Sequence, residues 1–131
     1  MKKLKILDIG GSNGGHFFSL KNEVGDWFID KYYICEIPYF VGFHERNQLS
    51  DKIECITIEQ IGQLKEEKVD IVNISGTLQF LKDYVKILDL VKVLEPTYIL
   101  ILRTPIWDKE TTQVLQWHRV DSDGLRAINA A

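Results

Sequence analysis

A glycine-rich segment near the start of the chain carries its strongest signal for chemistry. It reads Asp8-Ile9-Gly10-Gly11-Ser12-Asn13-Gly14-Gly15-His16 and follows a short apolar run. Glycine allows the backbone to adopt positive φ and to approach a bound ligand closely. A helix that begins after such a loop has first N–H groups without partners inside the helix, and these can bind a polar or anionic group. The segment therefore predicts a nucleotide-binding loop.

Two nucleotide-binding patterns fit this loop, and each has a serine where the pattern has its middle glycine. The dinucleotide pattern G-x-G-x-x-G fits Gly10, Ser12 and Gly15. The pattern of S-adenosylmethionine-binding loops, an acid two residues before G-x-G-x-G, fits Asp8, Gly10, Ser12 and Gly14. A carboxylate at Asp8 would repel a pyrophosphate but suits the cationic methionine end of S-adenosylmethionine. We therefore predict that this cofactor is bound by Asp8, Gly10, Gly11, Ser12 and Gly14.

A second acidic residue, Glu36, follows the next apolar run and lies 22 residues after Gly14. A carboxylate at the end of the second strand of a nucleotide-binding sheet can accept both ribose hydroxyls. The alternative is a solvated acid at a strand end. We predict the ribose-binding role for Glu36.

The residue that ends the loop, His16, is a candidate general base, because a neutral imidazole can take a proton near neutral pH. A plain surface or packing role at a helix start, next to Phe17, is the alternative.

Further polar candidates follow the fourth and fifth apolar runs. Ser75, Gly76 and Gln79 follow the fourth run, and Gln79 could orient a hydroxyl of the methyl acceptor. Helix capping by Ser75 is the competing interpretation. Arg103 follows the fifth run and could hold an anionic substrate, such as a sugar phosphate or a carboxylate, or form a surface ion pair. Ile58 is predicted to pack on the adenine of the cofactor, or to belong to the ordinary core.

These candidates need a sheet that brings several strand ends together. Strands are predicted for five short apolar runs: Leu4–Ile9, Tyr32–Cys35, Ile53–Ile58, Val69–Ile74 and Tyr98–Leu102. Helices are predicted for the segments between and after them: Gly14–Asn22, Pro38–Gln48, Glu59–Glu67, Leu78–Leu94 and Asp108–His118. Such alternation favours parallel pairing with right-handed crossovers. The fold class is therefore α/β, a Rossmann-like doubly wound sheet of five parallel strands in the order 3-2-1-4-5, with helices on both faces.

Four segments resemble a known family. Ile6–His16 resembles motif I of class I S-adenosylmethionine-dependent methyltransferases, and Val69–Leu81 is similar to their fourth-strand segment. The Gly-Gly-His, Glu-x-Pro, Ser-Gly-x-Leu-Gln and Arg-Thr-Pro sequences resemble a group of bacterial methyltransferases associated with surface-polysaccharide gene sets. The resemblance covers residues 4 to about 117. It departs from the family at Ser12 and in lacking the sixth and seventh strands.

The resemblance implies methyl transfer from S-adenosylmethionine to a small molecule, with O-methylation of a sugar or another metabolite as the expected reaction. It also places Ser75, Gly76 and Gln79 near the methyl-donor sulfur. Two other classes stay open: a non-catalytic nucleotide-binding or assembly module, and a nicotinamide-dependent reductase.

Bulk properties exclude other functions. A net charge of −3 argues against a nucleic-acid surface, and no apolar stretch approaches the length of a membrane span. The two cysteines, Cys35 and Cys55, lie in apolar runs and form no metal-binding pattern, so we expect no metal and buried thiols in the cytoplasm.

One domain is expected over residues 1–118, followed by an irregular tail over 119–131 that a cloning remnant would explain. With only five strands, the strand at Tyr98–Leu102 forms a sheet edge next to Trp107 and Trp117. An open edge beside aromatic residues predicts a homo-oligomer through that edge.

Overall fold

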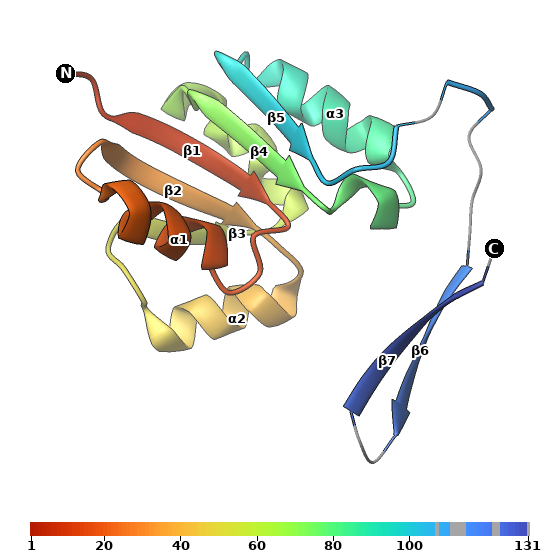
Figure 1. The fold of residues 1–131 in the computed structure, drawn as a ribbon. Coiled ribbons are helices and arrows are strands. Elements are labelled where there is room, and N and C mark those ends of the chain that lie inside the picture. Colours follow the sequence, from red (N-terminus) through yellow and green to blue (C-terminus); the bar gives the residue numbers. More distant parts are fainter. Residues whose placement is uncertain (107, 111–114, 122–123, 131) are drawn as a thin grey trace.

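The central sheet is parallel and has five strands in the order β3-β2-β1-β4-β5, as the sequence predicted (Figure 1). The computed structural model describes residues 1–106, 108–110, 115–121 and 124–130, the last two ranges as backbone only. The strands of the sheet are β1 (Leu4–Ile9), β2 (Ile29–Cys35), β3 (Ile53–Ile56), β4 (Ile71–Ser75) and β5 (Tyr98–Leu102). The helices are α1 (Gly15–Val24), α2 (Pro38–Asn47), the 3-10 helices η1 (Ile58–Glu67) and η2 (Leu78–Phe80), and α3 (Tyr84–Val93).

The two faces of the sheet are covered by different helices (Figure 1). Because side chains alternate along a strand, Ile6 and Leu7 of β1 point to opposite faces. Ile6 packs with Phe17 of α1, whereas Leu7 belongs to a larger cluster that includes Ile61 of η1 and Val91 of α3. Asp8 shares the face of Ile6, so its carboxyl group points toward α1 inside the protein.

The predicted helix over Leu78–Leu94 is divided in two. Leu81 is extended, with φ −92° and ψ 123°, and it separates η2 from α3. Asp83 then caps α3, because its side chain accepts the N–H of Lys86 at 3.2 Å. The apolar spacing continues across the break, which is why periodicity alone predicted a single helix.

The third strand ends two residues earlier than predicted, and the segment after it is a 3-10 helix. Thr57 and Gln60 form a capping box in which the Gln60 side chain accepts the Thr57 N–H at 2.9 Å. This cap starts η1 at Ile58 and removes that residue from the strand.

The prediction of a helix over Asp108–His118 and an irregular tail over 119–131 is wrong where the structure describes these residues. Leu115–Asp121 forms strand β6, which pairs antiparallel with β7 (Gly124–Ala130). Residues 111–114, within the predicted helix, lie outside the described residues, as does Trp107. The two strands pair only with each other, so the parallel sheet keeps five strands.

Strand β5 forms one edge of the sheet and is unusually exposed. Its five residues, Tyr-Ile-Leu-Ile-Leu, are each between 40% and 64% exposed. Strands of parallel sheets are normally covered on both faces, so this edge leaves apolar surface in contact with water. No helix in the described part of the chain is both long and apolar enough to cross a membrane.

Candidate functional site at the carboxyl ends of the strands

The glycine loop after β1 has the backbone conformation that its sequence predicts. Gly10, Ser12 and Gly14 all have positive φ, at 79°, 49° and 89°. A Cβ atom on Gly10 would overlap the Thr77 Oγ1 atom, so this position needs glycine for space as well as for φ. Ser12 adopts the left-handed conformation that glycine favours, which explains why the nucleotide-binding patterns have glycine at its position.

The peptide groups on the two sides of Ser12 are held by residues from other elements. The Ser12 N–H donates to Oε1 of Glu36 at 3.2 Å, and Nε2 of His44 donates to the Ser12 carbonyl oxygen at 2.7 Å. The other Glu36 oxygen accepts the N–H of Ile37 at 2.9 Å. The structure therefore brings together the loop and the acidic residue at the end of β2 that the sequence proposed as partners.

Asp8 lies beneath the loop and is fully buried. Its carboxylate accepts hydrogen bonds from Tyr32 Oη at 2.8 Å, from Asn73 Nδ2 at 3.0 Å and from His16 Nδ1 at 2.9 Å. A Cβ atom on Gly11 would lie 2.8 Å from Asp8 Oδ2, so the loop covers the carboxylate closely. The predicted direct contact between Asp8 and a ligand is therefore replaced by contacts with protein donors.

The Asp8 network has a clear electrostatic effect on Tyr32. Burial and the nearby Asp8 carboxylate raise the pKa of Tyr32 far above its ordinary value. The phenol therefore stays protonated and keeps donating to Asp8 at any physiological pH.

His16 joins this buried network to the surface. Its side chain is 38% exposed, and its Nδ1 atom faces the Asp8 carboxylate. A carboxylate accepts hydrogen bonds, so Nδ1 carries the ring proton. In the neutral ring, Nε2 then has a lone pair that can accept a proton. This is the tautomer that a general base next to the loop requires.

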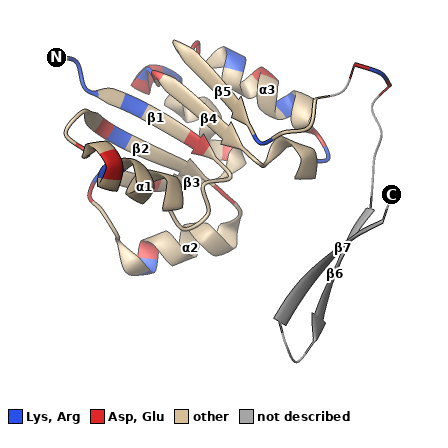
Figure 2. Cartoon of the chain, viewed as in Figure 1, with Lys and Arg blue, Asp and Glu red and all other residues tan. Residues whose placement is uncertain are grey.

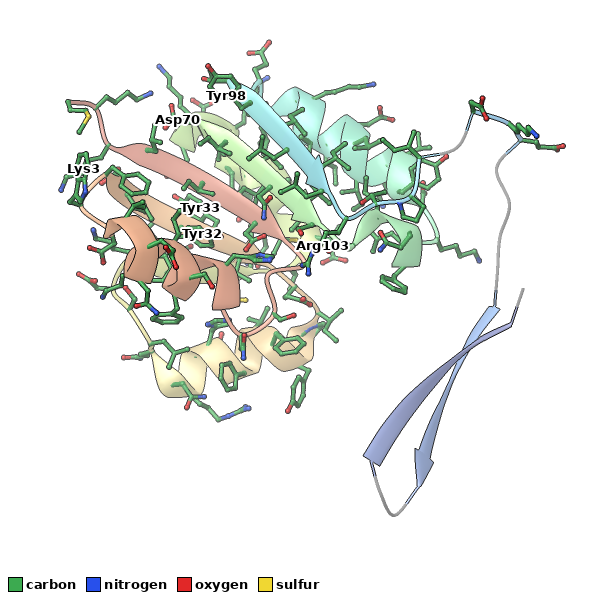
Figure 3. The ribbon with its side chains drawn as sticks, viewed as in Figure 1. Lys3, Tyr32, Tyr33, Asp70, Tyr98 and Arg103 are labelled. Atoms are coloured by element: carbon green, nitrogen blue, oxygen red, sulfur yellow. The ribbon has the colours of Figure 1, made fainter. Side chains whose placement is uncertain are left out.

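The candidates after β4 and β5 also lie together. Nε of Arg103 donates to Ser75 Oγ at 2.9 Å, and Nε2 of Gln79 donates to the Arg103 carbonyl oxygen at 3.3 Å. Gly76 has φ 62°, and its N–H donates to the Leu102 carbonyl oxygen at 2.9 Å. Figure 3 shows Arg103 at the edge of the sheet where the strands end. All four predicted residues therefore form one cluster beside the glycine loop.

Thr77 connects this cluster with the glycine loop, a role that the sequence did not reveal. Its Oγ1 atom lies 3.1 Å from the Ser75 carbonyl oxygen and 3.3 Å from that of Ile9. The hydroxyl thus bridges the last residues of β1 and β4.

Three other residues of the site escaped sequence reasoning: Tyr32, Asn73 and His44. Asn73 is a polar residue inside an apolar strand and lies opposite Asp8 in the register of β1 and β4. A single amide side chain in an otherwise apolar strand was the sequence feature that could have identified Asn73 as a site residue. His44 is buried in α2, and among the described residues its Nδ1 atom has no hydrogen-bond partner. Its contact with Ser12 depends on how α2 packs, which no local pattern specifies.

The remaining candidates have packing roles or lie apart. Ile58 is partly buried and packs against the larger core cluster. Burial raises the pKa of Cys35 to about 12 and that of Cys55 to about 11, so neither thiol is a nucleophile at neutral pH. Cys55 lines a cavity of about 540 Å³ between α2 and β3. The described residues contain no group of three or more His, Cys, Asp or Glu side chains that could hold a metal ion.

Comparison with known proteins gives matches in structure only. No model of a protein family matches the chain, and no curated protein matches its sequence. A S-adenosylmethionine-dependent methyltransferase from Aquifex aeolicus matches with a TM-score of 0.59 and 22% identity, over 84% of this chain and 63% of that one. A chain from the complex of the Haloferax volcanii Trm112 methyltransferase activator with a methyltransferase matches with a TM-score of 0.53 and 16% identity, over 69% and 39%.

The chain spans less than two thirds of the length of either of these proteins. The chain has a Rossmann-like fold of the kind found in S-adenosylmethionine-dependent methyltransferases.

Proposed function

We propose that this chain binds S-adenosylmethionine at the carboxyl ends of its strands and takes part in methyl transfer to a small molecule. The observation that carries the proposal is the 3.2 Å contact between the Ser12 N–H and Glu36. It places a left-handed glycine loop beside an acid at the end of the neighbouring strand, and both features occur at the nucleotide-binding sites of such sheets. The structural similarity to methyltransferases supports the same function.

The residues present fit this cofactor. Each Glu36 oxygen accepts one backbone N–H, and a carboxylate has about four acceptor sites, so two remain for the ribose hydroxyls. Gly10, Gly11 and Gly14 keep the loop backbone bare of side chains. Ile58 packs against the core but is only partly buried, so its exposed part would contact the adenine. Ser75 and Gly76 would face the methionine part. When bound, the cofactor supplies an electrophilic methyl group.

His16 is the residue that we assign to the acceptor proton. Because Nδ1 donates to Asp8, the ring orientation is fixed and Nε2 is available to accept a proton from an acceptor hydroxyl. Asp8 acts through His16 as a positioning residue. Gln79 lies in the cluster after β4, where it would orient the acceptor. A hydroxyl-bearing acceptor, such as a sugar or a similar metabolite, agrees with a base of this type.

We also propose that the protein self-associates through β5. An edge strand with apolar side chains exposed on both faces is a template for pairing, and a second copy of the same strand satisfies a closed two-fold arrangement.

Isothermal titration calorimetry with S-adenosylhomocysteine tests the cofactor assignment. We expect saturable binding to the chain and to the control variant Glu66→Ala, which removes an exposed acid far from the loop. No binding up to about 1 mM, the equivalent of roughly −4 kcal/mol, would contradict it. Tighter binding of NADH than of S-adenosylhomocysteine would instead favour a nicotinamide-dependent reductase. Binding without turnover of any acceptor would favour a non-catalytic module.

A further inference from the structure

The residue after β5, Arg103, has an uncommon backbone conformation. Its φ is 49°, in the left-handed region that residues with a side chain seldom adopt. The chain is held on both sides of it, because Leu102 accepts the Gly76 N–H at 2.9 Å and Gln79 donates to the Arg103 carbonyl at 3.3 Å. Strained residues that the surroundings hold in place occur often at ligand sites.

The guanidinium group of Arg103 is also held in place. Nε donates to Oγ of Ser75, which is buried, at 2.9 Å. A Cβ atom on Gly76 would lie 3.8 Å from Nη2 and 3.9 Å from Cζ of Arg103, so the planar group lies against the Gly76 backbone. One of its five N–H donors is used by Ser75, and four remain.

No carboxylate neutralises this charge in the part of the chain that the structure describes. Ion pairs within 4.0 Å are formed by six lysines: Lys2, Lys5, Lys21, Lys31, Lys52 and Lys92. Arg103 forms none with a described residue, although the chain carries more acidic than basic side chains. In Figure 2 the carboxyl ends of the strands show little other positive charge.

We propose that Arg103 binds an anionic group, a carboxylate or a phosphate, of the methyl acceptor. The planar fork of arginine matches both groups with two parallel hydrogen bonds. The Arg103 carbonyl oxygen accepts from Gln79, so the anion would lie next to the residue assigned to the acceptor. The acceptor is therefore an acidic metabolite, such as a sugar phosphate or a sugar acid. This assignment rests on the proposed methyl-transfer function.

The test uses inorganic phosphate as the probe, with the backbone N–H signals of Ser75 and Gly76, which lie against the guanidinium, followed by NMR in the full chain. We expect a saturable shift in the parent and in the control variant Arg46→Gln, which removes an exposed guanidinium from α2. Affinity for phosphate should fall at least tenfold in Arg103→Gln and by a smaller factor in Arg103→Lys. Equal phosphate affinity in the parent and in Arg103→Gln, or no saturable shift, overturns the proposal.

A second arm separates the acceptor from the cofactor, whose methionine part also carries a carboxylate. S-adenosylhomocysteine and 5′-methylthioadenosine, which lacks that carboxylate, are titrated into the parent and into Arg103→Gln. We expect both affinities to change less than threefold. A tenfold loss for S-adenosylhomocysteine alone would assign Arg103 to the cofactor and overturn the acceptor assignment. Failure of the parent to bind S-adenosylhomocysteine would count against the proposed function, whereas the phosphate arm still measures the Arg103 site.

Discussion

Nδ1 of His16 donates to a carboxylate oxygen of Asp8 across 2.9 Å, and this contact links a buried polar network to a partly exposed imidazole. Tyr32 and Asn73 donate to the same carboxylate, so Asp8 has three partners and no contact with solvent. A buried acid of this kind is stable only while its donors stay in place. The His16 imidazole and the groups that hold it are therefore parts of a single cluster.

Asp8→Asn should lower the free energy of unfolding by about 2–3 kcal/mol, because the amide turns a donor toward groups that donate to the carboxylate. Urea denaturation measures this loss. The control is Asp30→Asn, since Asp30 is an exposed acid on β2. If the two variants unfold at the same urea concentration, the Asp8 network does not contribute as described.

Nitrogen-detected NMR of the His16 ring should show a proton on Nδ1 and none on Nε2 in the neutral form. This follows from the donation of Nδ1 to Asp8. His16→Ala should abolish methylation of an acceptor that carries both a hydroxyl and an anionic group. The affinity of this variant for S-adenosylhomocysteine should stay within threefold of that of the parent. A proton on Nε2 instead of Nδ1 would remove the case for His16 as a base.

Glu36→Ala should weaken S-adenosylhomocysteine binding by about 1–3 kcal/mol, the range for hydrogen bonds to a charged group. The loss has two sources, since Glu36 would bind the ribose and also holds the Ser12 N–H. Calorimetry measures the affinity, and unfolding experiments should show little change in global stability. Unchanged binding in this variant would mean that the ribose lies elsewhere.

Ser12→Gly should be more stable than Ser12→Ala by about 1 kcal/mol. Both variants lose the hydroxyl, but only glycine relieves the left-handed strain at φ 49°. Thermal or urea denaturation of the pair measures the difference directly. Equal stability would indicate that the loop relaxes to another conformation when the side chain changes.

Stability should fall at alkaline pH because of Cys35. Burial raises the pKa of Cys35 to about 12 in the folded chain, whereas an unfolded thiol ionises near pH 9. Above pH 9 the unfolded state therefore holds fewer protons than the folded state, and the stabilisation present below pH 9 is lost as the pH rises toward 12. Between pH 8.5 and pH 10.5 the free energy of unfolding should fall by about 1–2 kcal/mol more in the parent than in Cys35→Ala.

Light scattering at micromolar concentration should show a dimer or a larger assembly of the parent. Ile101→Lys should dissociate this assembly, because the lysine ammonium would lie on the exposed apolar surface of β5. A clean monomer in the parent, unchanged when residues 106–131 are removed, would rule out this assembly.

The sequence predicted the features that depend on local pattern. Continuous apolar runs identified the strands, and the Gly10–Gly14 spacing identified the left-handed loop. The division of the Leu78–Leu94 segment was missed because apolar spacing is the same on both sides of Leu81. Strands β6 and β7 were missed because they pair with each other, away from the alternating pattern of the parallel sheet.

At the site, the sequence identified residues but not always their surroundings. Glu36 and Arg103 were predicted from their places at strand ends, and the structure brings them to the expected edge. Asp8 was expected to face the ligand, yet side-chain alternation in β1 directs it toward α1, where Tyr32 and His16 reach it. Contacts such as His44 with Ser12 join elements that are far apart in the chain, and these depend on packing rather than on local sequence.

The two hydrogen bonds at Ser12 have a consequence for recognition. Glu36 holds its N–H and His44 holds its carbonyl oxygen, so the loop has its shape before any ligand arrives. A preorganised loop loses little conformational entropy when a ligand binds, and more of the contact energy is left as affinity. Association should then follow a single fast phase without a slow closing step, and weakening either contact should lower the affinity mainly through the entropy of binding.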